Sequence, residues 1–219
     1  MPDRTLAASL GSLLFLVSIV APGAAQTDRA DASEWTHTEG APGGGRYSPL
    51  SDIHPGNVAQ LELVWSYRHG DVRAPSLRPD RVNRSSSFEG TPLVFDGRLV
   101  VSTPFNRVIA LDVATGRELW TFDPEIDVTR FFANMLISRG VAQWRGGDPT
   151  QPCGHRVLSA TLDGRLFALD AATGLPCEGF GEAGEVDLLA GLEGVVDPHE
   201  WNVTSPPTVV GDVVIVGSS

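Results

Sequence analysis

The chain has 219 residues, 42% hydrophobic and 20% charged, which is enough to bury one sizeable core in one or two domains. Its 27 acidic and 16 basic residues give a net charge of −11, which disfavours a nucleic-acid binder because no net positive field faces the phosphates. Every basic residue is arginine, so a Schiff-base lysine and a Walker-type phosphate lysine are excluded within this chain. Its 24 glycines and 16 prolines favour strands joined by turns over helices.

Residues 1–25 have the pattern of a secretory signal peptide. After Arg4, an apolar run from Leu6 to Val20 leads into small residues, and we expect cleavage after Ala25. The alternative is an uncleaved membrane anchor, but a helix of this run would span only about 22 Å of a roughly 30 Å hydrocarbon core. The sequence therefore predicts an exported protein with no integral membrane segment after cleavage.

The chain contains two cysteines, Cys153 and Cys177. In an exported protein such a pair is more often a disulfide than a metal site. A zinc site is the alternative, and His155 lies close to Cys153, but no matching histidine flanks Cys177. The sequence therefore favours a disulfide.

An internal repeat organises the rest of the chain. The sequence VIALDVATG at Val108–Gly116 returns as LFALDAATG at Leu166–Gly174, 58 residues later, and the preceding segments RLVVST and RVLSAT repeat with the same spacing. A third echo, 115 residues apart, relates Thr91–Ser102 to Pro206–Gly217. A period of about 50 to 58 residues filled with short strands predicts the blades of a β-propeller.

Local patterns agree with this reading. The runs Leu93–Val101 and Thr208–Val216 are rich in β-branched residues and are interrupted by Asp-Gly or Gly-Asp, which predicts hairpins. In the repeated turn, Asp112 can accept amide hydrogens while Gly116 takes the left-handed conformation.

Tryptophans follow the same period. We expect Trp120 to pack against the neighbouring blade, and Trp65, 55 residues earlier, to play this part for an earlier blade. The second repeat has Glu178 at the equivalent position, and Phe180 is expected to cover part of the gap.

Several ordered segments are more specific than the blade unit A-x-D-x-x-T-G-x-x-x-W. In chain order they are GRYSPL from Gly45, NV from Asn57, WSY from Trp65, FEGTP from Phe88, SRGVA from Ser138 and TSPP from Thr204. Together they resemble the pyrroloquinoline-quinone-dependent dehydrogenases, from about Glu34 to Ser219. The resemblance implies an all-β, eight-bladed propeller of which residues 26–219 form the N-terminal part: an opening segment, two blades and the first strand of a third.

Within that family the chain is most similar to the glucose/quinate/shikimate enzymes, through CGHRVLSATLDGRL from Cys153 and GLPC ending at Cys177. Alcohol dehydrogenases of the family carry two adjacent cysteines five and six residues before the arginine that matches Arg139. Ala133 and Asn134 stand there in this chain, which speaks against the alcohol branch.

The resemblance also implies the chemistry. Such enzymes oxidise a sugar or polyol hydroxyl to a carbonyl, with pyrroloquinoline quinone as hydride acceptor and, in the complete protein, a divalent cation (calcium or magnesium). Electrons pass on to a respiratory quinone or a cytochrome, and the location is the periplasm. The catalytic aspartate and further metal ligands are expected beyond residue 219, so the chain alone is expected to be an inactive portion.

Four residues match family positions that contact the quinone: Glu89, Arg139, Thr204 and Ser219. The resemblance implies that Arg139 pairs with the anionic quinone edge, that the two hydroxyls bond the carboxylates and that Glu89 lies at the rim. Taken singly, each has a simpler reading as a surface turn, strand-start, solvated or terminal residue. As an ordered set on a matching scaffold they favour a site.

Other readings remain open. One alternative is a non-catalytic periplasmic scaffold propeller of the outer-membrane assembly type, which would show a lipobox cysteine near Ala25, where this sequence has none. Another is the sensor domain of a membrane kinase, which would need a kinase or membrane segment that this sequence does not show. His199-Glu200 has no second histidine at the helical spacing of a metal motif. The sequons at Asn83 and Asn202 receive no weight, because the signal and the family resemblance indicate a bacterial protein.

Overall fold

The computed structural model describes residues 33–40, 43–72, 85–130, 132–192, 194, 197 and 200–218. The predicted signal peptide, the sequon at Asn83, His199 and Ser219 lie outside these ranges. Apart from the short 3-10 helix η1 (Val58–Gln60), the regular elements in them are strands, so the all-β prediction is confirmed. None of the helical structure in these ranges is long and apolar enough to cross a bilayer.

Blade 1 is an antiparallel sheet whose strands follow one another in sequence order. It consists of β2 (Leu93–Phe95), β3 (Arg98–Ser102), β4 (Val108–Asp112) and β5 (Glu118–Phe122). The predicted hairpin is present: Leu93 pairs with Val100 across the turn between β2 and β3. The strands are short because Asp-Gly and Asp-x-x-Thr-Gly sequences turn the chain after each run of β-branched residues.

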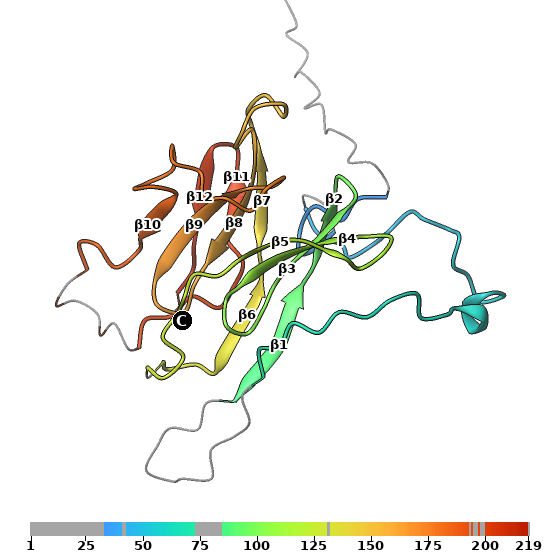
Figure 1. Ribbon diagram of the computed structural model, residues 1–219, viewed down its shortest axis with the longest axis horizontal. Coiled ribbons are helices and arrows are strands. Elements are labelled where there is room, and N and C mark those ends of the chain that lie inside the picture. The colour runs from blue at the N-terminus through green and yellow to red at the C-terminus, as the bar shows by residue number, and fades with distance from the viewer. Residues whose placement is uncertain are drawn as a thin grey trace, which may run out of the picture.

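Blade 2 repeats this architecture (Figure 1). It consists of β7 (Ala142–Arg145), β8 (His155–Ala160), β9 (Arg165–Asp170) and β10 (Glu185–Asp187). The repeat seen in the sequence is a repeat of structure, since Arg98 pairs with Asp112 in blade 1 as Arg156 pairs with Asp170 in blade 2.

A third blade begins with the hairpin of β11 (Thr208–Val210) and β12 (Val213–Ile215). It contributes two strands, one more than the single strand counted from the resemblance, because the Gly211-Asp212 turn completes the hairpin that the local pattern predicts.

Parallel strands lead into the blades. β1 (Ser86–Thr91) and β6 (Leu136–Gly140) lie side by side, with Ser86 opposite Leu136, and continue into β2 and β7 respectively (Figure 1). The register shifts between Phe88 and Thr91. The segment before β11 joins the same row, because the amide of Arg139 donates to the Thr204 carbonyl at 2.9 Å.

The main core fills the space between the two blades. Its buried members are Leu93, Phe95, Val100, Val108, Ala110, Trp120, Val141, Val157, Phe167, Leu169 and Ala171. Alternate residues of the facing strands supply these side chains, as the period of two along a strand requires. A second face of blade 2 packs on the β11–β12 hairpin, where Phe180 contacts the same cluster as Val209 and Val214.

Tryptophan docking between consecutive blades follows the prediction. The Trp120 ring lies against Gly174 and its Nε1 donates to the Ala171 carbonyl at 3.3 Å. The Trp65 ring lies against Gly116 in the same way, with Nε1 donating to the Val113 carbonyl at 3.2 Å. The segment around η1, which precedes Trp65, extends away from the blades (Figure 1), and Leu63 is 85% exposed.

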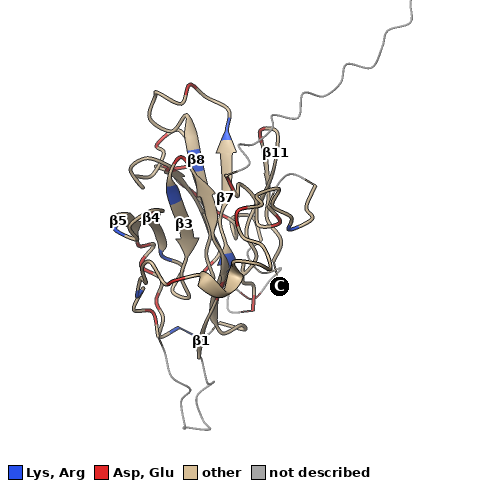
Figure 2. Ribbon diagram, turned by 90° about the vertical axis from the view of Figure 1, so that its right-hand side faces the viewer, with Lys and Arg blue, Asp and Glu red and all other residues tan. Residues whose placement is uncertain are grey.

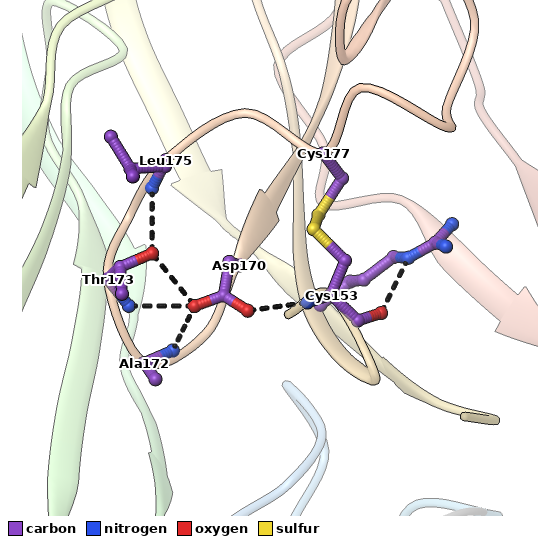
Figure 3. The surroundings of a disulfide bond; sticks show 7 residues. Cys153, Asp170, Ala172, Thr173, Leu175 and Cys177 are labelled. Carbon is purple, nitrogen blue, oxygen red and sulfur yellow. Dashed lines mark hydrogen bonds between the residues drawn. A yellow bond between two sulfur atoms is a disulfide. The ribbon is translucent and has the colours of Figure 1, made fainter. Parts of the chain in front are cut away.

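Cys153 and Cys177 are joined by a disulfide, with a Cα–Cα distance of 5.8 Å (Figure 3). The bond ties the loop before β8 to the segment after β9, beside the turn that begins at Asp170. The cysteine pair is therefore a cross-link within blade 2 rather than a zinc site.

Candidate functional site

Three of the four predicted site residues lie together on neighbouring inner segments. Glu89 belongs to β1, Arg139 to β6, and Thr204 to the segment before β11. The Arg139 guanidinium is the centre of the group: its Nε lies 3.4 Å from Glu89 Oε2, and its Nη1 donates to Thr204 Oγ1. Residues 50 and 65 positions apart in the sequence thus meet at one place. The fourth, Ser219, lies outside the described residues.

Glycine makes the close approach of β1 possible. A Cβ at Gly90 would lie 2.9 Å from the Ser102 carbonyl oxygen of β3, closer than such atoms approach. The register shift in β1 falls between Phe88 and Thr91, the stretch that contains both Glu89 and Gly90. Next to Arg139 on β6, the Ser138 hydroxyl donates to the Ser102 hydroxyl of β3 at 2.8 Å, and both residues are buried.

A buried ion pair lies beside β1 and was not anticipated from the sequence. Asp71 is 4% exposed and accepts hydrogen bonds from Thr103 Oγ1, the Phe105 amide and the Arg107 guanidinium. The hydrogen bond to Asp71 raises the pKa of the Arg107 side chain against the opposing effect of burial. This pair fixes the segment before residue 73 against blade 1.

Two buried asparagines were also missed. Asn106 is 1% exposed and Asn202 is 0% exposed, and their carboxamides bond to the backbone of neighbouring segments. No sequence pattern indicated this role at Asn106, and Asn202 was considered only as a sequon. The burial of Asn202 is incompatible with a glycan on this folded structure.

Charges are otherwise distributed over the surface. Figure 2 shows basic positions at the ends of β3, β7 and β8 and acidic positions mostly in the loops.

The donor set suits an anionic, planar ligand. Arg139 has 46% of its side chain exposed, and an arginine fork can bond two oxygens of one carboxylate. Thr204, 6% exposed, adds a hydroxyl, and Glu89 accepts from the guanidinium without burying it. Among the described residues, no group of three or more His, Cys, Asp or Glu side chains could hold a metal ion. The three residues thus fit the quinone that the resemblance implies, while this part of the chain offers no ligand set for the cation.

A cavity of about 850 Å³ lies elsewhere, over the disulfide end of blade 2. Its lining includes Arg98, Pro152, His155 and Leu175 but none of the three site residues. At the site itself, the Arg139 and Glu89 side chains are 46% and 42% exposed.

Comparison with known proteins decides the family. Residues 35–219 match the family model described as "PQQ: Glucose/ethanol/alcohol dehydrogenase, beta-propeller domain". The chain belongs to this family. Membership confirms the resemblance drawn from the ordered segments.

Individual relatives are similar over most of this chain. A quinoprotein glucose dehydrogenase of Gluconobacter oxydans (strain 621H) is 31% identical over 204 residues, which is 89% of this chain and 24% of the relative. The glycerol dehydrogenase large subunit of the same strain is 38% identical over 175 residues, covering 78% and 22%.

A solved structure agrees with these sequence matches. The quinohemoprotein alcohol dehydrogenase from Comamonas testosteroni superposes with a TM-score of 0.65 at 32% identity, covering 85% of this chain and 23% of its own. The chain thus spans about a quarter of the length of the relatives that it matches.

Proposed function

We propose that the complete protein containing this chain is a pyrroloquinoline-quinone-dependent dehydrogenase that oxidises a sugar or polyol hydroxyl to a carbonyl. The observation that carries the proposal is the position of Arg139 between Glu89 and Thr204 on three neighbouring inner segments. Family membership supports it, as do relatives named for glucose and for glycerol.

In this proposal the residues of the chain bind and orient the cofactor. The Arg139 guanidinium donates to the anionic edge of the quinone, while the Thr204 and Ser219 hydroxyls donate to its carboxylates. Glu89 accepts from Arg139 Nε and holds the guanidinium at the rim of the site. When bound, the quinone supplies an electrophilic carbonyl that takes a hydride from the substrate.

The remaining parts of the proposal concern the complete protein. We assign it a divalent cation, calcium or magnesium, and a respiratory quinone or a cytochrome as electron acceptor. We also assign it to the periplasm, after cleavage of a signal peptide near Ala25. N-terminal sequencing of exported protein should begin near Gln26, and an intact Met1 on membrane-bound material would contradict the cleavage.

The site is tested in the full-length protein by titrating the cofactor and following dye-linked oxidation of glucose and glycerol. Arg139→Ala is expected to weaken cofactor affinity about ten- to hundred-fold, since a charge-assisted contact contributes roughly 1.5 to 3 kcal/mol. Arg145→Ala is the matched control, because Arg145 is also 46% exposed and pairs with acids, but it lies at the far end of β7 beside Glu34. Equal cofactor affinity in wild type and Arg139→Ala would remove Arg139 from the site.

A further inference from the structure

Asn106 and Asn202 flank the Arg139 site without touching the guanidinium. Asn106 occupies the turn between β3 and β4 in a left-handed conformation (φ +61°), and Asn202 lies two residues before Thr204. Both carboxamides are fully buried, and a buried carboxamide without partners is costly. Their hydrogen bonds therefore show which segments they hold together.

Both asparagines hold Leu162, in the turn between β8 and β9 of blade 2. Asn106 Oδ1 accepts from the Leu162 amide at 2.8 Å, and Asn202 Nδ2 donates to the Leu162 carbonyl at 3.0 Å. Asn106 comes from blade 1 and Asn202 from the segment that leads into the third blade. The backbone of one residue in blade 2 thus forms hydrogen bonds with segments on both sides of that blade.

The other ends of the two carboxamides reach the strand that carries Arg139. Asn106 Nδ2 donates to the Ile137 carbonyl at 3.4 Å, and Asn202 Oδ1 accepts from the Asn134 amide at 3.2 Å. β6 is therefore anchored two residues before Arg139 and again just before the strand begins.

Asn202 is connected to both segments that meet at the contact between Arg139 and Thr204. It holds the lead-in to β6 through Asn134, and it holds its own segment, whose Thr204 carbonyl accepts from the Arg139 amide at 2.9 Å. The Thr204 hydroxyl, which accepts from the guanidinium, is placed by the same segment. An exposed arginine side chain otherwise samples many rotamers, so the register of these segments decides where its fork points.

We propose that Asn202, supported by Asn106, is a positioning residue for the Arg139 guanidinium. It fixes the register between β6 and residues 202–204, so that Thr204 and Glu89 hold the guanidinium in one orientation before any ligand arrives. The inference rests on the proposed function, because the oriented guanidinium is the group assigned to the anionic edge of the quinone.

The test measures three quantities in the full-length protein: amide hydrogen exchange in the peptide containing Arg139, the Tm, and the affinity for pyrroloquinoline quinone. Asn202→Ala is expected to speed exchange of the Arg139 amide and to weaken cofactor affinity at least ten-fold. The double variant Asn202→Ala/Thr204→Ala is expected to lose less affinity than the sum of the single losses, because Asn202 acts through Thr204.

Two control variants separate positioning from general loss of stability. Asn57 also uses both ends of its carboxamide on backbone groups, accepting from the His54 amide at 2.8 Å and donating to the Asp52 carbonyl at 2.6 Å, but it lies in the extended segment around η1. Asn57→Ala should leave all three quantities unchanged. Leu158→Ala removes a buried side chain from the face of blade 2 that packs on the β11–β12 hairpin. This variant should have a lower Tm but retain its cofactor affinity.

Unchanged exchange at the Arg139 amide in Asn202→Ala would overturn the inference. An equal loss of cofactor affinity in Leu158→Ala, at a similar Tm, would overturn it as well. If wild type fails to bind the quinone, the proposed function fails, and the exchange measurement still decides whether Asn202 orders Arg139. If wild type binds and Arg139→Ala weakens binding while Asn202→Ala does not, only the positioning role is lost.

Discussion

The two copies of the repeated turn have the same internal structure and different surroundings. In blade 1, Asp112 Oδ1 accepts from the Thr115 amide at 2.9 Å and its hydroxyl at 2.7 Å. In blade 2, Asp170 Oδ1 accepts from the Thr173 amide at 2.9 Å and its hydroxyl at 2.8 Å. Each turn ends in a glycine of positive φ, against which a tryptophan ring lies.

The turn in blade 2 is more buried than the turn in blade 1 and has additional contacts with the rest of its blade. Asp112 is half-buried, whereas Asp170 is 8% exposed and its second oxygen also accepts from the Cys153 amide at 2.6 Å (Figure 3). Trp120, on the second turn, is 8% exposed, while Trp65 lies on the first turn at the edge of the described blades. The disulfide follows the second turn directly.

The comparison separates local from tertiary contributions. The sequence Ala-Leu-Asp-x-Ala-Thr-Gly is sufficient to form the turn and to accept a tryptophan, since both copies do so. How much either contact stabilises depends on whether another blade covers it, because burial sets the free energy of the same contact.

Trp120→Ala should have the largest effect on stability. Removing a buried tryptophan between blades 1 and 2 is expected to cost about 3–5 kcal/mol of unfolding free energy, measured by urea denaturation. Trp65→Ala, the same change at the more open turn, should cost about 1–2 kcal/mol. Equal losses would mean that burial does not distinguish the two contacts.

Removal of the disulfide should come next. The cysteines are 24 residues apart, and closing such a loop in the unfolded chain contributes roughly 3 kcal/mol. Cys153→Ala/Cys177→Ala is expected to lose this amount, and labelling of denatured, unreduced wild type should find no free thiol. Two reactive thiols per chain would contradict the cross-link.

Substitution of the turn glycines should have a smaller effect that still differs between the copies. A Cβ at Gly174 would lie 2.5 Å from the Trp120 ring, and one at Gly116 would lie 2.5 Å from the Trp65 ring. Both changes also strain a left-handed residue by about 1–2 kcal/mol. Because the buried Trp120 cannot move aside, Gly174→Ala should cost about 2–3 kcal/mol and Gly116→Ala only the strain. Thermal unfolding of both variants measures the difference.

The smallest effect concerns pH. Burial acts to raise the pKa of Asp170, but hydrogen bonds from Cys153, Thr173 and Ala172 outweigh it and keep this pKa below its ordinary value. A carboxyl of lowered pKa stabilises the fold above its unfolded pKa, about 3.9, and loses this contribution as pH falls. Asp170→Asn should therefore cost about 1 kcal/mol at pH 7.

The pH dependence of that cost is the sharper measurement. The difference in Tm between wild type and Asp170→Asn should stay constant down to about pH 4 and shrink below it. Asp112→Asn, at the less buried copy of the turn, serves as the control and should shift the Tm less. A gap that widens as the pH falls would contradict the assigned direction of the pKa.

Much of the local structure could be predicted from the sequence. The repeat predicted the equivalence of β3–β4 with β8–β9, the Asp-Gly and Gly-Asp signals predicted both hairpins, and the tryptophan period predicted both docking contacts. The missing tryptophan at Glu178 could be read off the repeat. Glu178 directly follows the disulfide-bonded Cys177, and β10 begins seven residues later at Glu185.

The candidate site could be predicted only in part. The family resemblance singled out Glu89, Arg139 and Thr204, but not that Arg139 bonds both of the others. Asn106, Asn202 and Asp71 carried no warning of their role, because a polar residue in a loop looks the same in sequence whether it is exposed or buried.

The turns, the strands and their periodic order could therefore be predicted without a structure, since these features depend on backbone preferences and on contacts between near neighbours. The burial of particular polar groups, and the hydrogen bonds between distant segments, became known from the packing of the folded chain. Those outcomes depend on how one blade packs against the next, and the same side chain is costly or stabilising according to the partners that packing provides.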